Sequence, residues 1–146
     1  MTTVAELLKQ KSAEIYSVSP NHTVFDAIKL MDEYGIGALA VVSGESLAGI
    51  LSERDYARKV ILKGRSSKET KVKDIMTAEV FYTSPEEDIN ACMVVMTEHH
   101  IRHLPVLENS KLVGMISLGD VVKDIIKEQK DKIKQLEKNI SWGESY

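Results

Sequence analysis

Apolar residues in the first half of the chain recur at the spacings of helices and strands. Four of them fall on one helical face after Thr23, a residue whose hydroxyl can cap a helix. Two apolar runs follow with a short polar turn between them, which predicts a β-hairpin. The predicted elements are a short helix around residues 4–8, a strand at 15–18, a helix from 23 to about 35, strands at 38–42 and 47–51, and a helix from about 52.

The same series returns in the second half, displaced by 65 residues, with no gap between Ser19 and Asp55. Identical pairs along this register include Gly49 with Gly114 and Asp55 with Asp120. A single unit of this size cannot bury its apolar face alone, so we expect an α/β protein in which two β-α-β-β-α units share one core. The second unit predicts a strand at 80–83, a helix from 88 to about 96, strands at 104–107 and 112–116, and a helix from about 118.

The last predicted helix is long, because no glycine or proline interrupts it from residue 120 to residue 142. Its apolar residues alternate in spacings of four and three, as in the seam of a coiled coil. We therefore expect a homodimer through this helix or through the neighbouring repeat helices; the alternative is a helix that folds back on its own domain. The seam consists of Val122, Ile126, the polar exception Gln129, Ile133, Leu136 and Ile140.

The polar stretch at 63–71 has few core candidates and is predicted to link the two units. The expected division is a first domain at 1–62 with the N-terminal helix, this linker, a second domain at 72–126 and a helical extension at 127–146.

Composition narrows the class of protein. The 146 residues are 43% hydrophobic, which is ample for a buried core, and the net charge of -3 leaves no broad basic surface for a nucleic acid. No stretch approaches the roughly 20 apolar residues that span a bilayer. Cys92 is the single cysteine and is expected to be a buried small hydrophobe. We expect a cytoplasmic protein without a nucleic-acid or membrane partner.

Each unit carries a serine and an aspartate where its last strand ends and a helix begins. These pairs are Ser52 with Asp55 and Ser117 with Asp120. A carboxylate has two acceptor oxygens, which can hold both hydroxyls of a ribose, and the start of a helix favours a nearby anion. The alternative is that both residues only cap their helices. The recurrence at equivalent strand ends favours a binding site.

The cations that a phosphate would need differ between the units. Arg102-His103 in the second unit stands where the first has Gly37-Ala38. Arginine offers a fork of donors to phosphate oxygens, and histidine becomes cationic near neutral pH. The alternative is a solvated surface pair. Arg54 and Lys11 are further candidates for phosphate binding.

Metal binding and catalysis have little support in the sequence. His99 and His103 are four residues apart, but the segment that follows Ile101 is extended and Pro105 disfavours a helix there. No cysteine or acidic third ligand accompanies them, so we expect no metal site. Nothing matches a nucleophile paired with a base, a P-loop or a glycine-rich dinucleotide motif. We expect no enzyme and no catalytic cofactor.

Taken together, these motifs resemble a tandem pair of cystathionine β-synthase (CBS) domains over almost the whole chain. The chain is similar to the stand-alone kind, in which no enzyme or channel is attached to the pair. The segments that carry the resemblance are Ser-Val-Ser-Pro at 17–20, Gly-Ile-Leu-Ser-Glu-Arg-Asp at 49–55, Val-Lys-Asp-Ile-Met at 72–76, Ile-Arg-His-Leu-Pro-Val at 101–106 and Gly-Met-Ile-Ser-Leu-Gly-Asp at 114–120.

The resemblance implies a fold and a ligand class. The two repeats would pack through their sheets about a pseudo-twofold axis, as a Bateman module with two clefts, and two such pairs often meet as a disc-shaped dimer. The implied regulatory ligand contains adenosine, as in AMP, ADP, ATP or an NADH-like molecule.

The resemblance also implies roles for single residues. Asp55 and Asp120 would hold ribose, Ser52 and Ser117 would approach ribose or phosphate, and Arg102-His103 would meet phosphate. Because Gly37-Ala38 departs from the basic pattern, charge at the first unit would come from Arg54 and Lys11. The residues that would contact adenine are Ile101, the segment from Met76 to Ala78 and the segment from Ala13 to Ile15.

We therefore predict a sensing module, in which an adenine nucleotide binds in a cleft and changes what the outer helices or the C-terminal helix present to a protein partner. The alternative is a ligand-free structural module that dimerises or regulates a partner protein. A nucleotide-processing enzyme is disfavoured, because it would need a base, a nucleophile or metal ligands.

Overall fold

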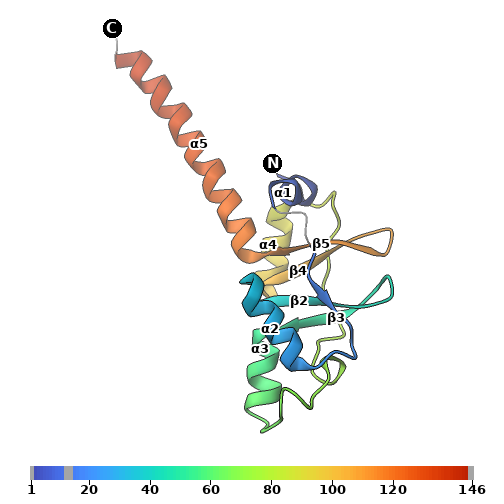
Figure 1. The fold of residues 1–146 in the computed structure, drawn as a ribbon. Coiled ribbons are helices and arrows are strands. Elements are labelled where there is room, and N and C mark those ends of the chain that lie inside the picture. The colour runs from blue at the N-terminus through green and yellow to red at the C-terminus, as the bar shows by residue number, and fades with distance from the viewer. Residues whose placement is uncertain (1, 12–14, 145–146) are drawn as a thin grey trace.

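The computed structural model describes residues 2–11 and 15–144, with side chains through Ile140 (Figure 1). Its elements follow the predicted order, except that the second half lacks the strand expected at 80–83. They are α1 (Val4–Gln10), β1 (Ser17–Val18), α2 (Val24–Tyr34), β2 (Ala38–Ser43), β3 (Ser46–Ser52), α3 (Glu53–Tyr56), the π-helix η1 (Ala57–Ile61), the 3-10 helix η2 (Val72–Asp74), α4 (Ile89–Glu98), β4 (His103–Glu108), β5 (Lys111–Ser117) and α5 (Leu118–Glu144).

Local capping sets the ends of α2 as the sequence predicted. The Asp26 backbone N–H donates to the Thr23 hydroxyl over 3.1 Å, which satisfies one of the free donors of the first turn. Gly35 follows the last turn with φ of 62°, a left-handed conformation that glycine adopts without steric cost. The predicted helix from 23 to about 35 is confirmed, and Ala27 and Met31 on its apolar face are buried.

The two hairpins show that the 65-residue repeat extends to backbone pairing. Ala38 pairs with Ser52 in the β2–β3 hairpin, and His103 pairs with Ser117 at the equivalent place in the β4–β5 hairpin. Both hairpins have a shift in register at the same point, after Val41 in the first and after Val106 in the second. Figure 1 shows the hairpins side by side, and β3 contacts β5 where the two units meet.

The strand expected at 80–83 is reduced to a single parallel bridge between Thr83 and Val106. This bridge matches the pair formed by Val18 and Val41 in the first unit, where β1 adds a second pair. Pro105 explains the difference, because it has no N–H to donate and so cannot extend the pairing beyond Thr83. The prediction of a strand was wrong, although the position of the segment beside β4 was right.

The single shared core that the repeat suggested is also wrong, because the structure has one buried cluster in each unit. The units instead exchange their preceding segments. Val4 and Leu7 of α1 pack with Cys92, Leu104 and other residues of the second unit. Val72 and Ile75, at the start of the predicted second domain and ahead of its repeat, pack in the core of the first unit together with Leu39 and Leu51. Each core is therefore completed by a segment that lies next to the other unit in sequence.

The predicted long C-terminal helix is confirmed as α5, which projects away from the body of the molecule (Figure 1). Val121 at its start is buried in the second core, whereas every side chain from Gln129 to Ile140 is exposed. Within the described residues, no helix is both long and apolar enough to cross a lipid bilayer.

Candidate functional site

A cavity of about 640 Å³ lies beside the Ser52–Asp55 tip, and residues of both units line it. The first unit contributes the end of β3 and the start of α3. The second unit contributes the segment that leads into β4, and the segment that follows η2 closes one side. The lining residues are Gly37, Ile50, Ser52, Glu53, Arg54, Asp55, Thr77, Glu79, Val80, Phe81, His100, Ile101, Arg102 and His103.

Asp55 is held in place by a reciprocal cap at the start of α3. The Ser52 backbone N–H and hydroxyl each donate to Asp55 Oδ2 over 3.0 Å, and the Asp55 N–H donates to Ser52 Oγ over 3.1 Å. The other oxygen, Oδ1, accepts from Lys59 Nζ at 3.1 Å and from the Thr77 hydroxyl at 3.4 Å. Ser52 and Asp55 therefore do cap the start of α3, as the alternative interpretation proposed. The cap occupies Oδ2, so a ligand hydroxyl could replace only the partners of Oδ1.

The basic pair predicted for phosphate reaches the cavity from the second unit. Arg102 and His103 lie in the same cavity as Asp55 and Gly37, so the aspartate tip of one unit is combined with the cations of the other. Burial lowers the pKa of His103, and this effect outweighs the nearby Asp120 carboxylate, which raises it. Burial therefore favours the neutral imidazole of His103 over the cation that the sequence suggested.

The fixed charges around the cavity nearly cancel. Arg54 and Arg102 are permanent cations, whereas the lining contains three carboxylates, those of Glu53, Asp55 and Glu79. Arg54 also joins the two units, because its Nη1 donates to the His100 carbonyl over 3.3 Å. The cavity therefore contains individual arginine cations but does not have a strongly positive surface.

Apolar residues form the remaining walls. Phe81 lines the cavity and stacks on His99 with ring centroids 4.0 Å apart. Ile50 and Thr77 exchange backbone hydrogen bonds of 3.0 and 2.9 Å, which fixes the segment after η2 against β3. Ile101 adds an aliphatic surface. These walls can accept a flat apolar ring.

Not every residue predicted to contact adenine is at the cavity. Met76 packs against the first core behind Gly49, and Ala78 is exposed outside the lining. Ala13 lies outside the described residues, whereas Ile15 is 38% exposed and does not line the cavity.

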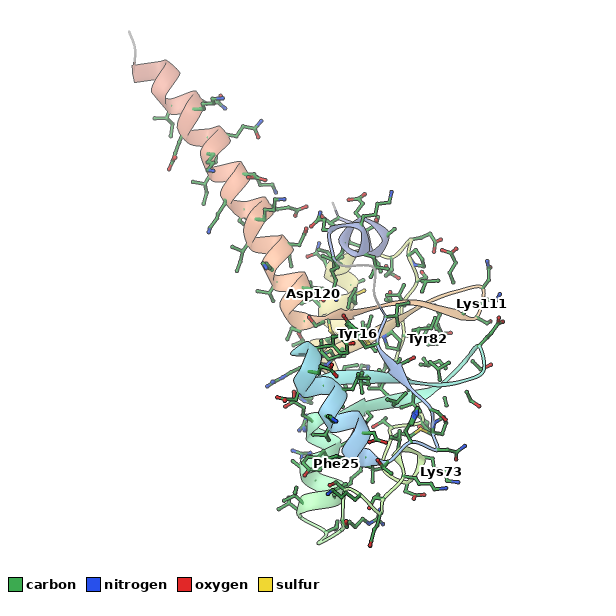
Figure 2. All side chains as sticks on the ribbon, in the orientation of Figure 1. Tyr16, Phe25, Lys73, Tyr82, Lys111 and Asp120 are labelled. Carbon is green, nitrogen blue, oxygen red and sulfur yellow. The ribbon has the colours of Figure 1, made fainter. Side chains whose placement is uncertain are left out.

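The second serine-aspartate tip has a different environment (Figure 2, where Asp120 lies at the base of α5). The Ser117 backbone N–H donates to Asp120 Oδ2 over 2.9 Å, and Lys11 Nζ binds the same oxygen over 2.6 Å. Lys11 also donates to the Met115 carbonyl over 2.8 Å. The lysine expected to support the first tip is thus bound at the second tip, and neither Ser117 nor Asp120 lines the cavity beside Asp55.

The pKa of Asp120 predicts how Lys11 affects stability in acid. Burial raises this pKa, but hydrogen bonds from Lys11 and Ser117 outweigh burial and leave it below its ordinary value. A carboxyl with a depressed folded pKa stabilises the fold above its unfolded pKa of about 3.9, and that contribution is lost as the pH falls through the lower folded value. We expect Lys11→Met to make the loss of stability below about pH 4 shallower.

Urea unfolding from pH 6 to pH 2 measures this effect, with the exposed Lys9→Met as the control for loss of one positive charge. Identical acid profiles for the two variants would show that the ion pair does not shift the titration of Asp120.

Sequence reasoning missed several residues of the site, among them Lys59 and the lining residues Glu53, Glu79 and Phe81. Thr77 lies within the segment from Met76 to Ala78 that was predicted to contact adenine. Only the partner of Asp55 had a usable signal, because Lys59 follows it by four residues, the spacing of a helical ion pair. Glu53 lies at the start of α3, whereas Glu79 and Phe81 come from a loop whose position depends on packing between the units.

The comparisons with known proteins agree on one family. The CBS domain model matches residues 4–62 and 72–127. An Arabidopsis thaliana CBS domain-containing protein, the mitochondrial CBSX3, is 41% identical over 97% of this chain and 73% of its own.

Solved structures show the same likeness. A signal-transduction protein with CBS domains from Burkholderia ambifaria is 57% identical, with a TM-score of 0.85, over 88% of this chain and 96% of its own. The CBS domain pair of protein MJ0100 was solved with 5′-methylthioadenosine and S-adenosyl-L-methionine. It shares the fold at 20% identity, with a TM-score of 0.77, over 88% of this chain and 98% of its own.

Proposed function

Since this chain belongs to the CBS domain family, with one CBS domain in each half, we propose that it is a regulatory module that binds an adenosine-containing ligand in the cavity beside Asp55. One observation carries the proposal. A single cavity combines a carboxylate suited to a ribose diol, an arginine from the other unit and apolar walls suited to a base.

Each part of the ligand has a matching surface. The ribose hydroxyls would donate to Asp55 Oδ1 in place of Thr77 and Lys59. Both of these side chains are at least partly exposed and can form hydrogen bonds with water instead. The adenine would lie against Phe81 and Ile101. A phosphate would accept from the Arg102 guanidinium, whose planar donors fit phosphate oxygens. A ligand bound in this way would touch both units and favour the arrangement in which they are joined.

The near-cancelling charge of the cavity indicates a ligand with few negative charges. Arg54, Arg102 and Lys59, which is paired with Asp55, balance the three carboxylates, so the cavity has no excess of positive charge for phosphates beyond the first. We infer that AMP, or an adenosyl ligand with an uncharged or cationic tail, binds more tightly than ATP.

A melting-temperature series tests this function. A ligand present at 100 times its dissociation constant stabilises a fold by about 2.7 kcal/mol. AMP, ADP, ATP, NADH, 5′-methylthioadenosine and S-adenosylmethionine would be compared at one ionic strength, with guanosine monophosphate as the control for the base. AMP or an adenosyl thioether should raise the melting temperature more than ATP does; no shift with any of them would refute sensing of adenosyl ligands.

The lowered pKa of His103 predicts that AMP binding takes up a proton. An anionic phosphate favours the imidazolium form, so His103 should gain charge in the complex at a pH where the free protein lacks it. The ratio of wild-type to His103→Gln affinity for AMP should rise as the pH falls from 7.5 to 6. The AMP phosphate also titrates in this range, with a second pKa of about 6, but it affects both proteins equally and so cancels in the affinity ratio.

Isothermal titration calorimetry in buffers of different ionisation enthalpy measures the same uptake directly. An affinity ratio that stays constant with pH would place His103 away from the phosphate.

A second candidate function is a ligand-free module that dimerises or regulates a protein partner. It is favoured by the second tip, where Lys11 and Ser117 already satisfy Asp120. Under this alternative the truncation of α5 after Ile126 abolishes dimerisation and partner capture, and nucleotides change neither. Under both candidates the protein is not an enzyme, and its location in the cytoplasm remains a prediction.

A further inference from the structure

The outer part of α5 has no packing partner among the described residues. The hydrogen bond of 2.8 Å from the Thr2 hydroxyl to Glu128 Oε1 joins the helix to the body. From Gln129 onward every described side chain is exposed, and Figure 1 shows the helix extending away from both units. Isolated helices shorter than about 12–15 residues are marginal in water. The part of α5 from Gln129 onward therefore gains stability from a partner.

One stripe of this projecting helix is apolar. Ile126, Ile133, Leu136 and Ile140 are 49%, 52%, 61% and 60% exposed, and their spacing places them on one face with Gln129. In heptad terms the isoleucines occupy position a, whereas Gln129 and Leu136 occupy position d. Isoleucine at a combined with leucine at d favours two parallel strands.

We propose that α5 forms a parallel, in-register, two-stranded coiled coil with a second copy of this chain. The seam would bury its isoleucines and Leu136 against the same residues of the partner helix. It begins at Val122, which is 39% exposed at the edge of the body. The interface is therefore continuous from the body to Ile140.

Charges beside the seam specify the parallel orientation. Lys132 is at position g and Glu137 at the following position e, so a parallel in-register pair brings each lysine next to the glutamate of the other helix. The antiparallel alignment that retains the longest seam places Lys130 near Lys130 of the partner subunit and Lys132 near the partner's Lys132, and these contacts offset the attraction between Lys123 and the partner's Glu137. Like charges at such positions are destabilising, so this alignment is disfavoured.

Gln129 specifies the register. In the parallel in-register pair it faces the same residue of the other helix, and the two side-chain amides can donate to and accept from each other. In the longest antiparallel alignment it faces Ile133, which leaves the amide without a partner. A polar residue at one core position fixes register at a cost in stability, as Gln129 would here.

The dimer would hold the two bodies at the same end of the coiled coil. Because α5 starts at Leu118, directly after Ser117, the coiled coil is joined to the second serine-aspartate tip through one continuous helix. The cavity beside Asp55 is lined by residues 37–103 and not by α5, so dimerisation leaves it accessible.

Sedimentation equilibrium on the full chain tests the interface. Wild-type protein should be dimeric at micromolar concentration, and Ile133→Glu should raise the dimer dissociation constant at least tenfold. Lys134→Glu, one residue away but outside the seam, is the matched control and should stay within about twofold of wild type. A monomeric wild type, or an Ile133→Glu variant that dimerises as wild type does, would overturn the proposal.

Charge exchange keeps the test valid if Ile133→Glu disturbs the helix. Lys132→Glu and Glu137→Lys should each weaken the dimer several-fold, and the double variant should recover wild-type affinity because it restores both pairs. Additive weakening in the double variant would overturn the parallel pairing.

A disulfide provides the final check on orientation. Gln129→Cys should oxidise to a covalent dimer, since a disulfide needs Cα atoms within about 7 Å and only the in-register parallel pair places residue 129 opposite itself. Buried Cys92 makes the wild type a suitable control. Dimerisation without this disulfide would overturn the parallel arrangement.

Discussion

Replacing Asp55 with alanine is expected to lower the affinity for AMP by about 100-fold. Hydrogen bonds to a charged group are worth about 1.5–3 kcal/mol each, and the variant removes the acceptor of both ribose hydroxyls. At 1.4 kcal/mol for each factor of ten, 100-fold corresponds to a loss of about 2.8 kcal/mol, close to the lower limit for two such bonds. Isothermal titration calorimetry with AMP measures it.

Asp120→Ala is the matched control for this experiment. Both aspartates accept from the backbone N–H of the preceding serine at the start of a helix, so both variants lose a similar cap, worth about 1 kcal/mol. Only Asp55 lines the cavity, and Asp120→Ala should therefore retain AMP binding. Equal losses of affinity in the two variants would contradict the assignment of this cavity as the binding site.

Arg102→Ala separates the phosphate from the nucleoside. It should weaken AMP binding and leave adenosine binding within about twofold, because adenosine has no phosphate for Arg102 to contact. A similar loss for both ligands would indicate that Arg102 supports the shape of the cavity instead.

Replacing Gly49 with alanine is expected to destabilise the protein by about 3 kcal/mol or more. A Cβ at this position would lie 2.5 Å from the Thr77 carbonyl oxygen, which accepts a hydrogen bond from the Ile50 backbone N–H. The clash is with backbone, so β3 and the segment after η2 must separate. Overpacking costs about 1–3 kcal/mol, and the exchanged hydrogen bonds between Ile50 and Thr77 add to it.

The equivalent glycine in the second unit provides an internal control. A Cβ at Gly114 would lie 2.7 Å from Leu8 Cδ2, the end of a flexible side chain that can rotate away. Gly114→Ala should therefore cost only about 1 kcal/mol. Urea unfolding followed by circular dichroism measures both variants, and equal losses of stability would show that the contact with Thr77 does not decide the outcome.

The repeat made most of the fold predictable. Gly35, Thr23 and Asp88 mark helix ends through local geometry, and each hairpin follows from two apolar runs around a polar turn. The errors concern pairing over longer distances. Pro105 shortens the strand expected at 80–83, and the exchange of α1 and η2 between the units divides the expected shared core into two.

The candidate site was predictable only in part. The pattern of serine and aspartate identified both tips, because it depends on short-range capping that the sequence records directly. The loop residues Glu79 and Phe81 had no such signal. The choice of partners for each tip was also hidden, since Arg102 reaches the cavity of Asp55 whereas Lys11 binds Asp120.

The sequence by itself determined the duplication, the order of elements within each unit, the two capped tips and the apolar seam of the last helix. All of these depend on residues close together in the chain, or on the fixed offset between the repeats. Only the tertiary structure decided which cations face which carboxylate and that burial lowers the pKa of His103. These features depend on packing between segments far apart in the chain, where burial and proximity set the charge.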